Sequence, residues 1–240
     1  MIPAQFDVRR LATTTSTMDV ASKLVAEGAR HGTVVVADEQ TAGRGRRGST
    51  WQSPPGAGLY LSLIARQPGA NLSLVTLAAG VAVREGIEAA TGLKADLKWP
   101  NDLIIDRHKL AGILAEGIAV GTPAQAVVIG VGINLQPAAY PPEVSARATS
   151  IEGELGRPID RELVLSSVLG ALWDRLALLE RSPGDILQAW RAASPSANGT
   201  RVEWDGRHGV TAGIDTTGAL LVQTADRVER IIAGELRWML

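Results

Sequence analysis

The pattern of apolar and polar positions predicts that helices and strands alternate in the first part of the chain. Ser16 precedes apolar residues at helical spacing that stop at Gly28, which is typical of a helix with a capped start and a glycine beyond its end. The runs at residues 33–37 and 59–65 predict buried strands. Residues 41–58 lack periodicity and are rich in Gly, Arg, Ser and Pro, which predicts a long functional or mobile loop.

Two more helices and four short strands are expected before residue 195. Helical spacing predicts a helix from near Asn71 to Gly92 and an amphipathic helix that begins at Asp160 and is ended by Pro183. Apolar runs predict strands at residues 97–99, 103–105, 110–117 and 126–132. The second and third of these flank a polar turn and therefore predict a β-hairpin.

The pattern changes near residue 195 to short strands separated by turn residues. The strands are expected at residues 201–204, 209–214, 220–223 and 228–232. Asp205-Gly206 and Thr217-Gly218 supply turn chemistry between them. We therefore predict an α+β domain at residues 1–194 and a small all-β barrel at residues 195–240.

Composition places the chain among ordinary globular proteins. The 240 residues are 45% hydrophobic and 20% charged, with a net charge of −1. Zero cysteines exclude a disulfide framework and Cys-ligated zinc, and three scattered histidines leave little for a His-based metal cage. The first residues do not have the pattern of a signal peptide, and no apolar run approaches the ~18 residues that a membrane span needs. We therefore expect a cytoplasmic protein without a membrane segment.

The charge is unevenly distributed. The 45 residues from Gln40 to Arg84 contain five arginines and no Asp or Glu, so the remaining residues carry −6. Arginines among glycines can meet a carboxylate or phosphate at close range, and glycine lets backbone amides approach an anion. This segment is either an anion-binding loop or a solvated basic loop.

Residues 43–48 match the dinucleotide-binding pattern G-x-G-x-x-G, but their context does not. That pattern must open a helix and be followed about 20 residues later by an acid, whereas here Pro54-Pro55 follows and no Asp or Glu occurs between the motif and Glu85. None of the four lysines lies in a Walker P-loop pattern, and no metalloprotease, nucleophile-elbow or kinase pattern occurs.

A second polar cluster is Lys98-Trp99-Pro100-Asn101-Asp102, followed by Lys109-Leu110-Ala111-Gly112. The oxygens of Asn101 and Asp102 suit Mg²⁺, and Lys109 offers a positive charge to an accompanying anion. A Pro-Asn-Asp string alone is more often a turn. Residues 43–48, which we call the arginine-glycine loop, change this weighting. Together with that loop, the cluster indicates a site that brings two anions together and stabilises charge at phosphorus.

Three segments carry a resemblance to a known family. EQTAGRGRRGSTWQSPPGAGLYLSL (39–63), KWPNDLIIDRHKLAGILAE (98–116) and IGVGINL (129–135) resemble the biotin protein ligases, and the resemblance covers about residues 13–240. It implies a mixed central sheet flanked by helices, similar to class II synthetases, and an SH3-like C-terminal barrel. It also implies an ATP-dependent ligase that uses Mg²⁺, forms biotinyl-5′-AMP and pyrophosphate, and then biotinylates a lysine of a carboxylase's biotin carboxyl carrier domain.

The resemblance also implies roles for particular residues. Lys109, Arg44 and Arg46 would act on the carboxylate and phosphate, Asn101 and Asn134 would bind ATP, and Asp102 would hold Mg²⁺. The residues implied to contact biotin or biotinyl-AMP are Ser16, Thr17, Met18, Gln40, Gly43, Arg44, Gly45, Arg46, Trp51, Lys109, Gly112, Gly130 and Gly132. Trp51 would cover the adenylate after the loop closes, or it is an ordinary packed aromatic residue.

Met18 stands where this family usually has asparagine, which puts the role of that side chain in doubt. Only about a dozen residues precede the first motif and the pI is about 6.3, so we expect a ligase without DNA binding. Whether the chain forms a homodimer stays open. The alternatives are a lipoate protein ligase and a non-enzymatic nucleic-acid-binding module, although nine aromatic residues in 240 offer little for bases to stack on.

Overall fold

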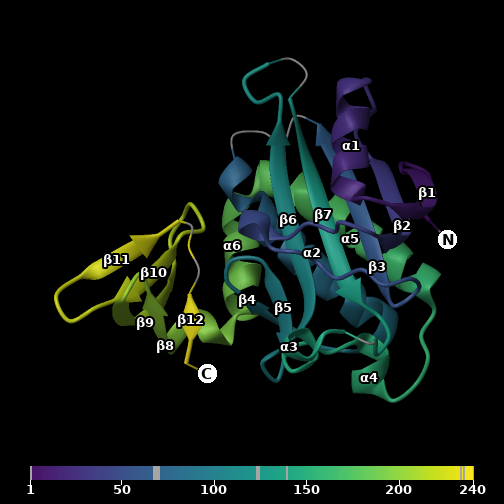
Figure 1. The fold of residues 1–240 in the computed structure, drawn as a ribbon. Coiled ribbons are helices and arrows are strands. Elements are labelled where there is room, and N and C mark those ends of the chain that lie inside the picture. The colour runs from purple at the N-terminus through teal and green to yellow at the C-terminus, as the bar shows by residue number, and fades with distance from the viewer. Residues whose placement is uncertain are drawn as a thin grey trace.

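The computed structural model describes residues 2–66, 71–122, 125–138, 140–232, 234 and 236–239. The chain forms a seven-stranded sheet with helices on both faces and, beside it, a second sheet of five strands (Figure 1). The first sheet has the strand order β1-β2-β3-β7-β6-β5-β4. Its β1–β2 pair is parallel and its other pairs are antiparallel, so the predicted mixed sheet flanked by helices is confirmed.

The elements of the larger unit follow one another along the chain. They are β1 (Asp7–Thr14), α1 (Thr17–Ala26), β2 (Thr33–Gln40), β3 (Gly58–Arg66), α2 (Val75–Thr91), β4 (Asp96–Lys98), β5 (Asp102–Ile105), β6 (His108–Ile118), β7 (Ala126–Asn134), α3 (Pro142–Ser145), α4 (Ile151–Leu155), α5 (Arg161–Arg181) and α6 (Pro183–Ala192). Short 3₁₀ turns lie at Arg46–Gly48, Leu72–Leu74 and Pro195–Ala197.

The central strands β3 and β7 are buried because both faces of the sheet are covered. On one face Leu61, Leu63 and Val131 pack into the main core with α2 and α5. On the other face Ile64 and Val128 pack with the buried side of α1 in a smaller cluster. This two-sided burial explains why both strands appear in the sequence as nearly continuous apolar runs.

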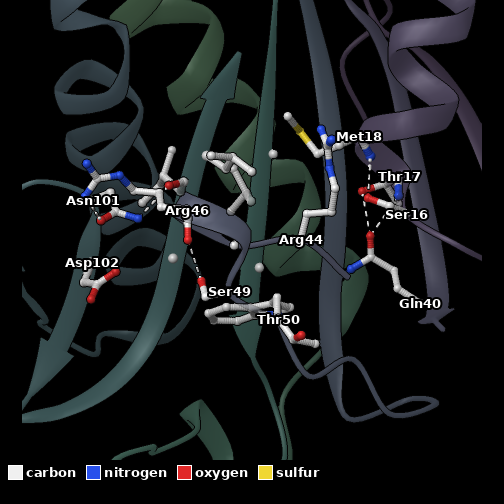
Figure 2. Close-up of a pocket in the computed structure, with 18 of the residues that line it drawn as sticks. Ser16, Thr17, Met18, Gln40, Arg44, Arg46, Ser49, Thr50, Asn101 and Asp102 are labelled. Atoms are coloured by element: carbon white, nitrogen blue, oxygen red, sulfur yellow. Dashed lines mark hydrogen bonds between the residues drawn. The ribbon is translucent and has the colours of Figure 1, made fainter. Parts of the chain in front are cut away.

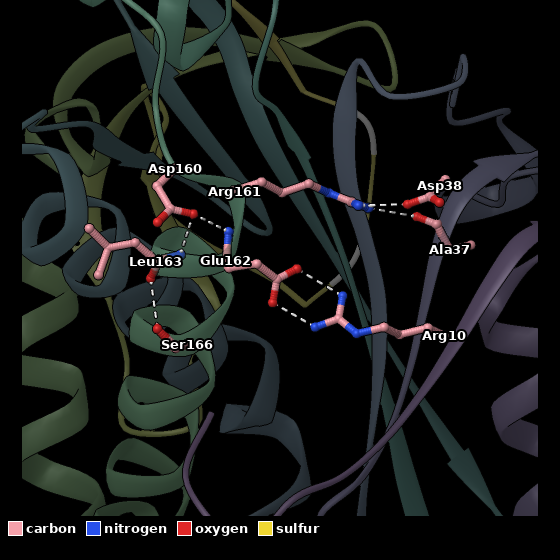
Figure 3. A network of polar contacts seen from close by, with 8 residues as sticks. All are labelled: Arg10, Ala37, Asp38, Asp160, Arg161, Glu162, Leu163 and Ser166. Atoms are coloured by element: carbon pink, nitrogen blue, oxygen red, sulfur yellow. Dashed lines mark hydrogen bonds and ion pairs between the residues drawn. The ribbon is translucent and has the colours of Figure 1, made fainter. Parts of the chain in front are cut away.

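Capping and ion pairs place the first turn of α5 against the strands (Figure 3). The Asp160 carboxylate accepts hydrogen bonds from the first backbone amides of α5, as expected of an N-cap. Glu162 then accepts two hydrogen bonds from Arg10 on β1, at 2.8 and 2.6 Å. Arg161 pairs with Asp38 on β2 at 2.6 Å. These contacts tie α5 to the edge of the sheet from which the arginine-glycine loop leaves.

The second sheet comprises β8 (Asn198–Trp204), β9 (Arg207–Ile214), β10 (Leu220–Gln223), β11 (Val228–Ile231) and β12 (Arg237–Trp238). Its order is β11-β10-β9-β8-β12 and its pairs are antiparallel, which agrees with the small all-β unit expected there. Asp205 and Gly206 both have positive φ, of 46° and 72°, in the turn between β8 and β9. Division of the chain into two domains at residue 195 stays a prediction.

Five helices and strands were missing from the sequence prediction, namely β1, α3, α4, α6 and β12. Strand β1 is an edge strand with mostly exposed or half-buried residues, so its apolar pattern is weak. Pro183 follows the end of α5, as predicted, but it also occupies the first turn of α6, where a proline needs no backbone N–H. Strand β12 has only two residues. No helix in the described part of the chain is long and apolar enough to cross a membrane.

Candidate active site

A cavity of about 310 Å³ lies where α1, the arginine-glycine loop and strands β6 and β7 meet (Figure 2). The predicted residues that line it are Ser16, Thr17, Met18, Gln40, Arg44, Gly45, Arg46, Trp51, Asn101, Asp102, Lys109, Gly112, Gly130 and Gly132. Two other predicted residues, Gly43 and Asn134, do not line it. The structure therefore brings together segments that are far apart in the sequence.

One end of the cavity is neutral and hydrogen-bonded. The Thr17 backbone amide and hydroxyl both donate to the Gln40 side-chain oxygen, at 2.8 and 3.1 Å. Ser62 donates to the Thr17 hydroxyl at 2.8 Å, and Gln40 donates to Ser53 at 2.8 Å. Ser16 is fully buried and caps α1 through the Met18 amide. Because each polar group has a partner, this end is preorganised for a polar, uncharged part of a ligand.

Glycines leave the floor of the cavity open. Side chains alternate along β7, so Gly130 and Gly132 face the cavity while their neighbours point into the main core. Gly112 on β6 lies directly opposite Gly132. A Cβ atom on Gly132 would come within 2.4 Å of the Trp51 indole, and one on Gly112 within 2.9 Å. Trp51 therefore lies so close to Gly112 and Gly132 that a side chain at either position would collide with its ring.

Two other close approaches shape the same region. A Cβ on Gly130 would lie 2.6 Å from the sulfur of Met18, so the buried Met18 side chain covers this glycine. A Cβ on Gly43 would lie 2.4 Å from the Trp51 carbonyl oxygen, and the Trp51 amide donates to the Gly43 carbonyl. Gly43 thus lets the loop fold back on itself rather than lining the cavity.

The arginines of the loop have different partners. Arg44 forms ion pairs with Glu116 on β6 and with Asp19 on α1, the latter at 3.4 Å. Arg46 donates to the Asn101 side-chain oxygen at 3.4 Å. Burial, reinforced by the neighbouring Arg47, lowers the pKa of Arg46, and Asp102 opposes this shift. Arg44 therefore fastens the loop to the protein, while Arg46 reaches the opposite end of the cavity (Figure 2).

That opposite end is charged. Lys109, at the start of β6, pairs with Asp102 of β5 at 2.6 Å, and its nitrogen lies 5.3 Å from the centre of the Trp51 ring. Asn101 is held by a hydrogen bond from its side-chain nitrogen to the Ile113 carbonyl. In the described part of the chain, no three His, Asp or Glu side chains gather to hold a metal ion. Asp102 could therefore hold Mg²⁺ only together with a ligand's own oxygens.

A second hollow, of about 540 Å³, adjoins the first and shares Arg46, Asp102 and Lys109 with it. Asn134 lines this hollow, but its amide is already engaged. Its nitrogen donates to the carbonyls of Lys109 and Thr149, at 3.2 and 2.9 Å. Its oxygen accepts from Tyr140 at 3.3 Å. In this structure Asn134 joins the strand that carries Lys109 to the segment at residue 149.

Sequence reasoning assigned no site role to several residues that line the second hollow. Among them are Lys98, Arg107, Tyr140, Arg147 and Trp238. Lys98 begins the Lys-Trp-Pro-Asn-Asp segment, so its position could have suggested a role. The others come from separate segments that only the tertiary structure brings together. Burial lowers the pKa of Lys98, with Lys109 adding to this shift and Asp102 opposing it.

Comparisons with known proteins identify relatives of this chain. The family model of the biotin/lipoate A/B protein ligase family matches residues 11–134. The chain belongs to this family. It is 37% identical to the biotin–[acetyl-CoA-carboxylase] ligase of Paracoccus denitrificans, over 94% of this chain and 98% of that protein. It is also 37% identical to the bifunctional ligase/repressor BirA of Bacillus subtilis, over 92% of this chain and 70% of that protein.

Solved structures of the ligase family share the fold. Biotin protein ligase from Aquifex aeolicus, in complex with biotin and ATP, superposes with a TM-score of 0.84 at 28% identity. That match covers 97% of this chain and 98% of the other. The α+β architecture with a small C-terminal β unit, expected from the resemblance, is therefore confirmed.

Proposed function

We propose that this chain is a biotin protein ligase, which activates biotin with ATP and passes the biotinyl group to a lysine of a biotin carboxyl carrier domain. The observation that carries the proposal is the convergence of Arg46, Lys109 and Asp102 where the two hollows meet. One hollow suits a small acid with a polar, uncharged head, and the other suits a nucleotide. Relatives that are named biotin ligases favour biotin over lipoate as the acid.

In the first step, a carboxylate oxygen of biotin would form a bond to the α-phosphorus of ATP. The bond from that phosphorus to the bridging oxygen then breaks, and pyrophosphate leaves. Because both reactants are anions, cations at the junction offset their repulsion and stabilise the charge that develops at phosphorus. We assign this role to Lys109 and Arg46, which approach the junction from different elements.

ATP would enter as its Mg²⁺ complex. Asp102 is a single carboxylate beside Asn101, and Mg²⁺ is commonly held by one or two carboxylates together with substrate phosphates. The ion would supply additional positive charge at the phosphates. Lys109, which pairs with Asp102 in this structure, would then be free to contact the biotin carboxylate.

The arginine-glycine loop would protect the intermediate. An acyl-adenylate reacts with water, so the site must stay closed until the acceptor amine arrives. Arg44 is tied to Asp19 on α1 and to Glu116 on β6, and Trp51 lies over the glycine pair. In the second step, the lysine amine of the carrier attacks the acyl carbon, the bond to the phosphate oxygen breaks, AMP leaves and the amine loses a proton.

Pyrophosphate release by the purified protein with MgATP tests the proposal, with biotin, lipoate or no acid added. Release with biotin alone supports it, because this half-reaction needs no carrier. Release with lipoate alone would reassign the acid. No release with either acid from a folded protein would contradict the ligase function and favour a binding module.

The partners are proposed at two levels. Relatives named biotin–[acetyl-CoA-carboxylase] ligases support a carboxylase carrier as the acceptor. The absence of DNA binding and the formation of a homodimer stay predictions. Sedimentation of the chain alone and with duplex DNA tests both. The net charge of −1 favours weak or no DNA binding.

A further inference from the structure

Two tryptophans join the C-terminal sheet to the segment that carries Lys98. The indole N–H of Trp99 donates to the Gly218 carbonyl at 3.0 Å, between β9 and β10. The Lys98 ammonium lies 5.6 Å from the centre of the Trp238 ring. Trp238 is held in place because β12 pairs with β8. The last strand of the chain therefore contacts a cation of the larger unit.

This contact lies in the second hollow, whose lining is strongly basic. Among the described residues that line it, the cations are Arg46, Lys98, Arg107, Lys109 and Arg147, and the acid is Asp102. Among the residues that the structure describes, no carboxylate forms an ion pair with Lys98, Arg107 or Arg147. In this described lining the cations outnumber the anion, and such a surface attracts a polyanionic ligand.

Lys98 differs from Lys109 in this hollow: both lie beside a tryptophan ring, but only Lys109 also has a carboxylate partner among the described residues. A lysine side chain has four flexible bonds, so an ammonium group without a fixed carboxylate partner samples many positions. A tryptophan face attracts such a group and restricts it to one side of the ring. Trp238 is half-buried and lines the same hollow, so a cation held over its ring stays at the ligand site.

We propose that Trp238 is a positioning residue that holds the Lys98 ammonium toward the polyphosphate of ATP, so that the C-terminal sheet contributes directly to nucleotide binding. This inference rests on the proposed function, which supplies ATP as the polyphosphate. It assigns no covalent step to Trp238. Under the proposed function biotin occupies the other hollow, which Trp238 and Lys98 do not line.

The test measures KM for ATP and KM for biotin in biotin-dependent pyrophosphate release. Trp238→Ala is expected to raise KM for ATP roughly three- to tenfold, the range for loss of a partly buried cation–π contact. KM for biotin should stay unchanged, and Trp238→Phe should recover most of the ATP affinity. Met239→Ala is the matched control, because Met239 is the next residue, is 48% exposed and lines a different hollow.

A double-mutant cycle separates positioning from folding. If Trp238 acts through Lys98, then Lys98→Ala combined with Trp238→Ala should raise KM for ATP no further than Lys98→Ala alone. Additive effects, equal rises in both KM values, or an unchanged KM for ATP would overturn the inference. Should Trp238→Ala fail to fold, Trp238→Leu takes its place in the same cycle, because leucine keeps an apolar side chain but offers no aromatic face to the ammonium.

A direct titration keeps the two proposals apart. A parent chain that releases no pyrophosphate with biotin contradicts the proposed function. Calorimetric titration with magnesium pyrophosphate, with biotin present, then tests the hollow itself. Weaker binding to Trp238→Ala than to Met239→Ala supports the inference. Equal binding, or no binding even to the parent chain, overturns it.

Discussion

Replacing Lys109 with alanine tests whether this lysine serves the chemistry rather than the fold. Its side chain is 36% exposed, and its ion pair with Asp102 spans 2.6 Å. A pair this accessible to water contributes about 0–1 kcal/mol to the free energy of unfolding. For a chain of this size, 1 kcal/mol corresponds to about 2–4 °C in Tm. We therefore expect Lys109→Ala to lower Tm by no more than about 4 °C.

The expected effect on the reaction is much larger. Removing one group that stabilises developing charge in a transition state typically costs about 10²–10³ in rate. The assay is biotin-dependent pyrophosphate release at saturating MgATP, with Tm measured on the same preparation. Lys94→Ala is the matched control, since Lys94 also pairs with a carboxylate, Glu88 at 3.6 Å, but lies outside both hollows.

Two outcomes would refute this reasoning. A large drop in Tm with Lys109→Ala would mean that the lost activity reflects unfolding. A rate within about tenfold of the Lys94→Ala control would mean that Lys109 contributes little to the transition state. A tenfold change in rate corresponds to only about 1.4 kcal/mol of activation free energy.

Three other substitutions test separate parts of the structure. Gly132→Ala places a Cβ within 2.4 Å of the Trp51 indole, so it should displace the ring, change tryptophan fluorescence and weaken biotin binding; unchanged fluorescence and affinity would contradict that packing. Arg44→Gly removes the ion pairs to Asp19 and Glu116, so biotinyl-AMP should dissociate faster in a chase experiment, and an unchanged rate would argue against a closing role. Burial lowers the pKa of His31, so the stability that it contributes is present above its ordinary pKa of about 6.5 and is lost as pH falls below that value. His31→Asn should therefore flatten the fall in Tm between about pH 7.5 and 5.5, and equal losses in both proteins would refute this.

Local patterns predicted most of the regular elements. The start of α1 at Ser16, the end of α2 at Gly92 and the start of α5 at Asp160 were all predicted from residues that cap their own helices. The buried strand β3 was predicted because its apolar run reflects coverage on both faces. Strand β1 could not be predicted in this way, since an edge strand keeps many polar residues.

The candidate site was predicted as a set of motifs but not as a geometry. Fourteen of the predicted residues line one cavity, which the motifs alone could not show. The pairing of Gly112 with Gly132 depends on the register of β6 against β7. The two hydrogen bonds that the Asn134 amide donates to the carbonyls of Lys109 and Thr149 form only because the fold places the segment at Thr149 beside Asn134.

The sequence by itself determined which segments become helices, strands and loops, and which chemical groups the loop and hairpin carry. Capping, turn chemistry and apolar periodicity act over a few neighbouring residues, so they can be recognised without the fold. Only the tertiary structure decided that Trp238 lies over Lys98 and that Arg44 reaches Glu116. Such contacts join residues far apart in the chain, and they form only because strand register and packing bring the two surfaces together.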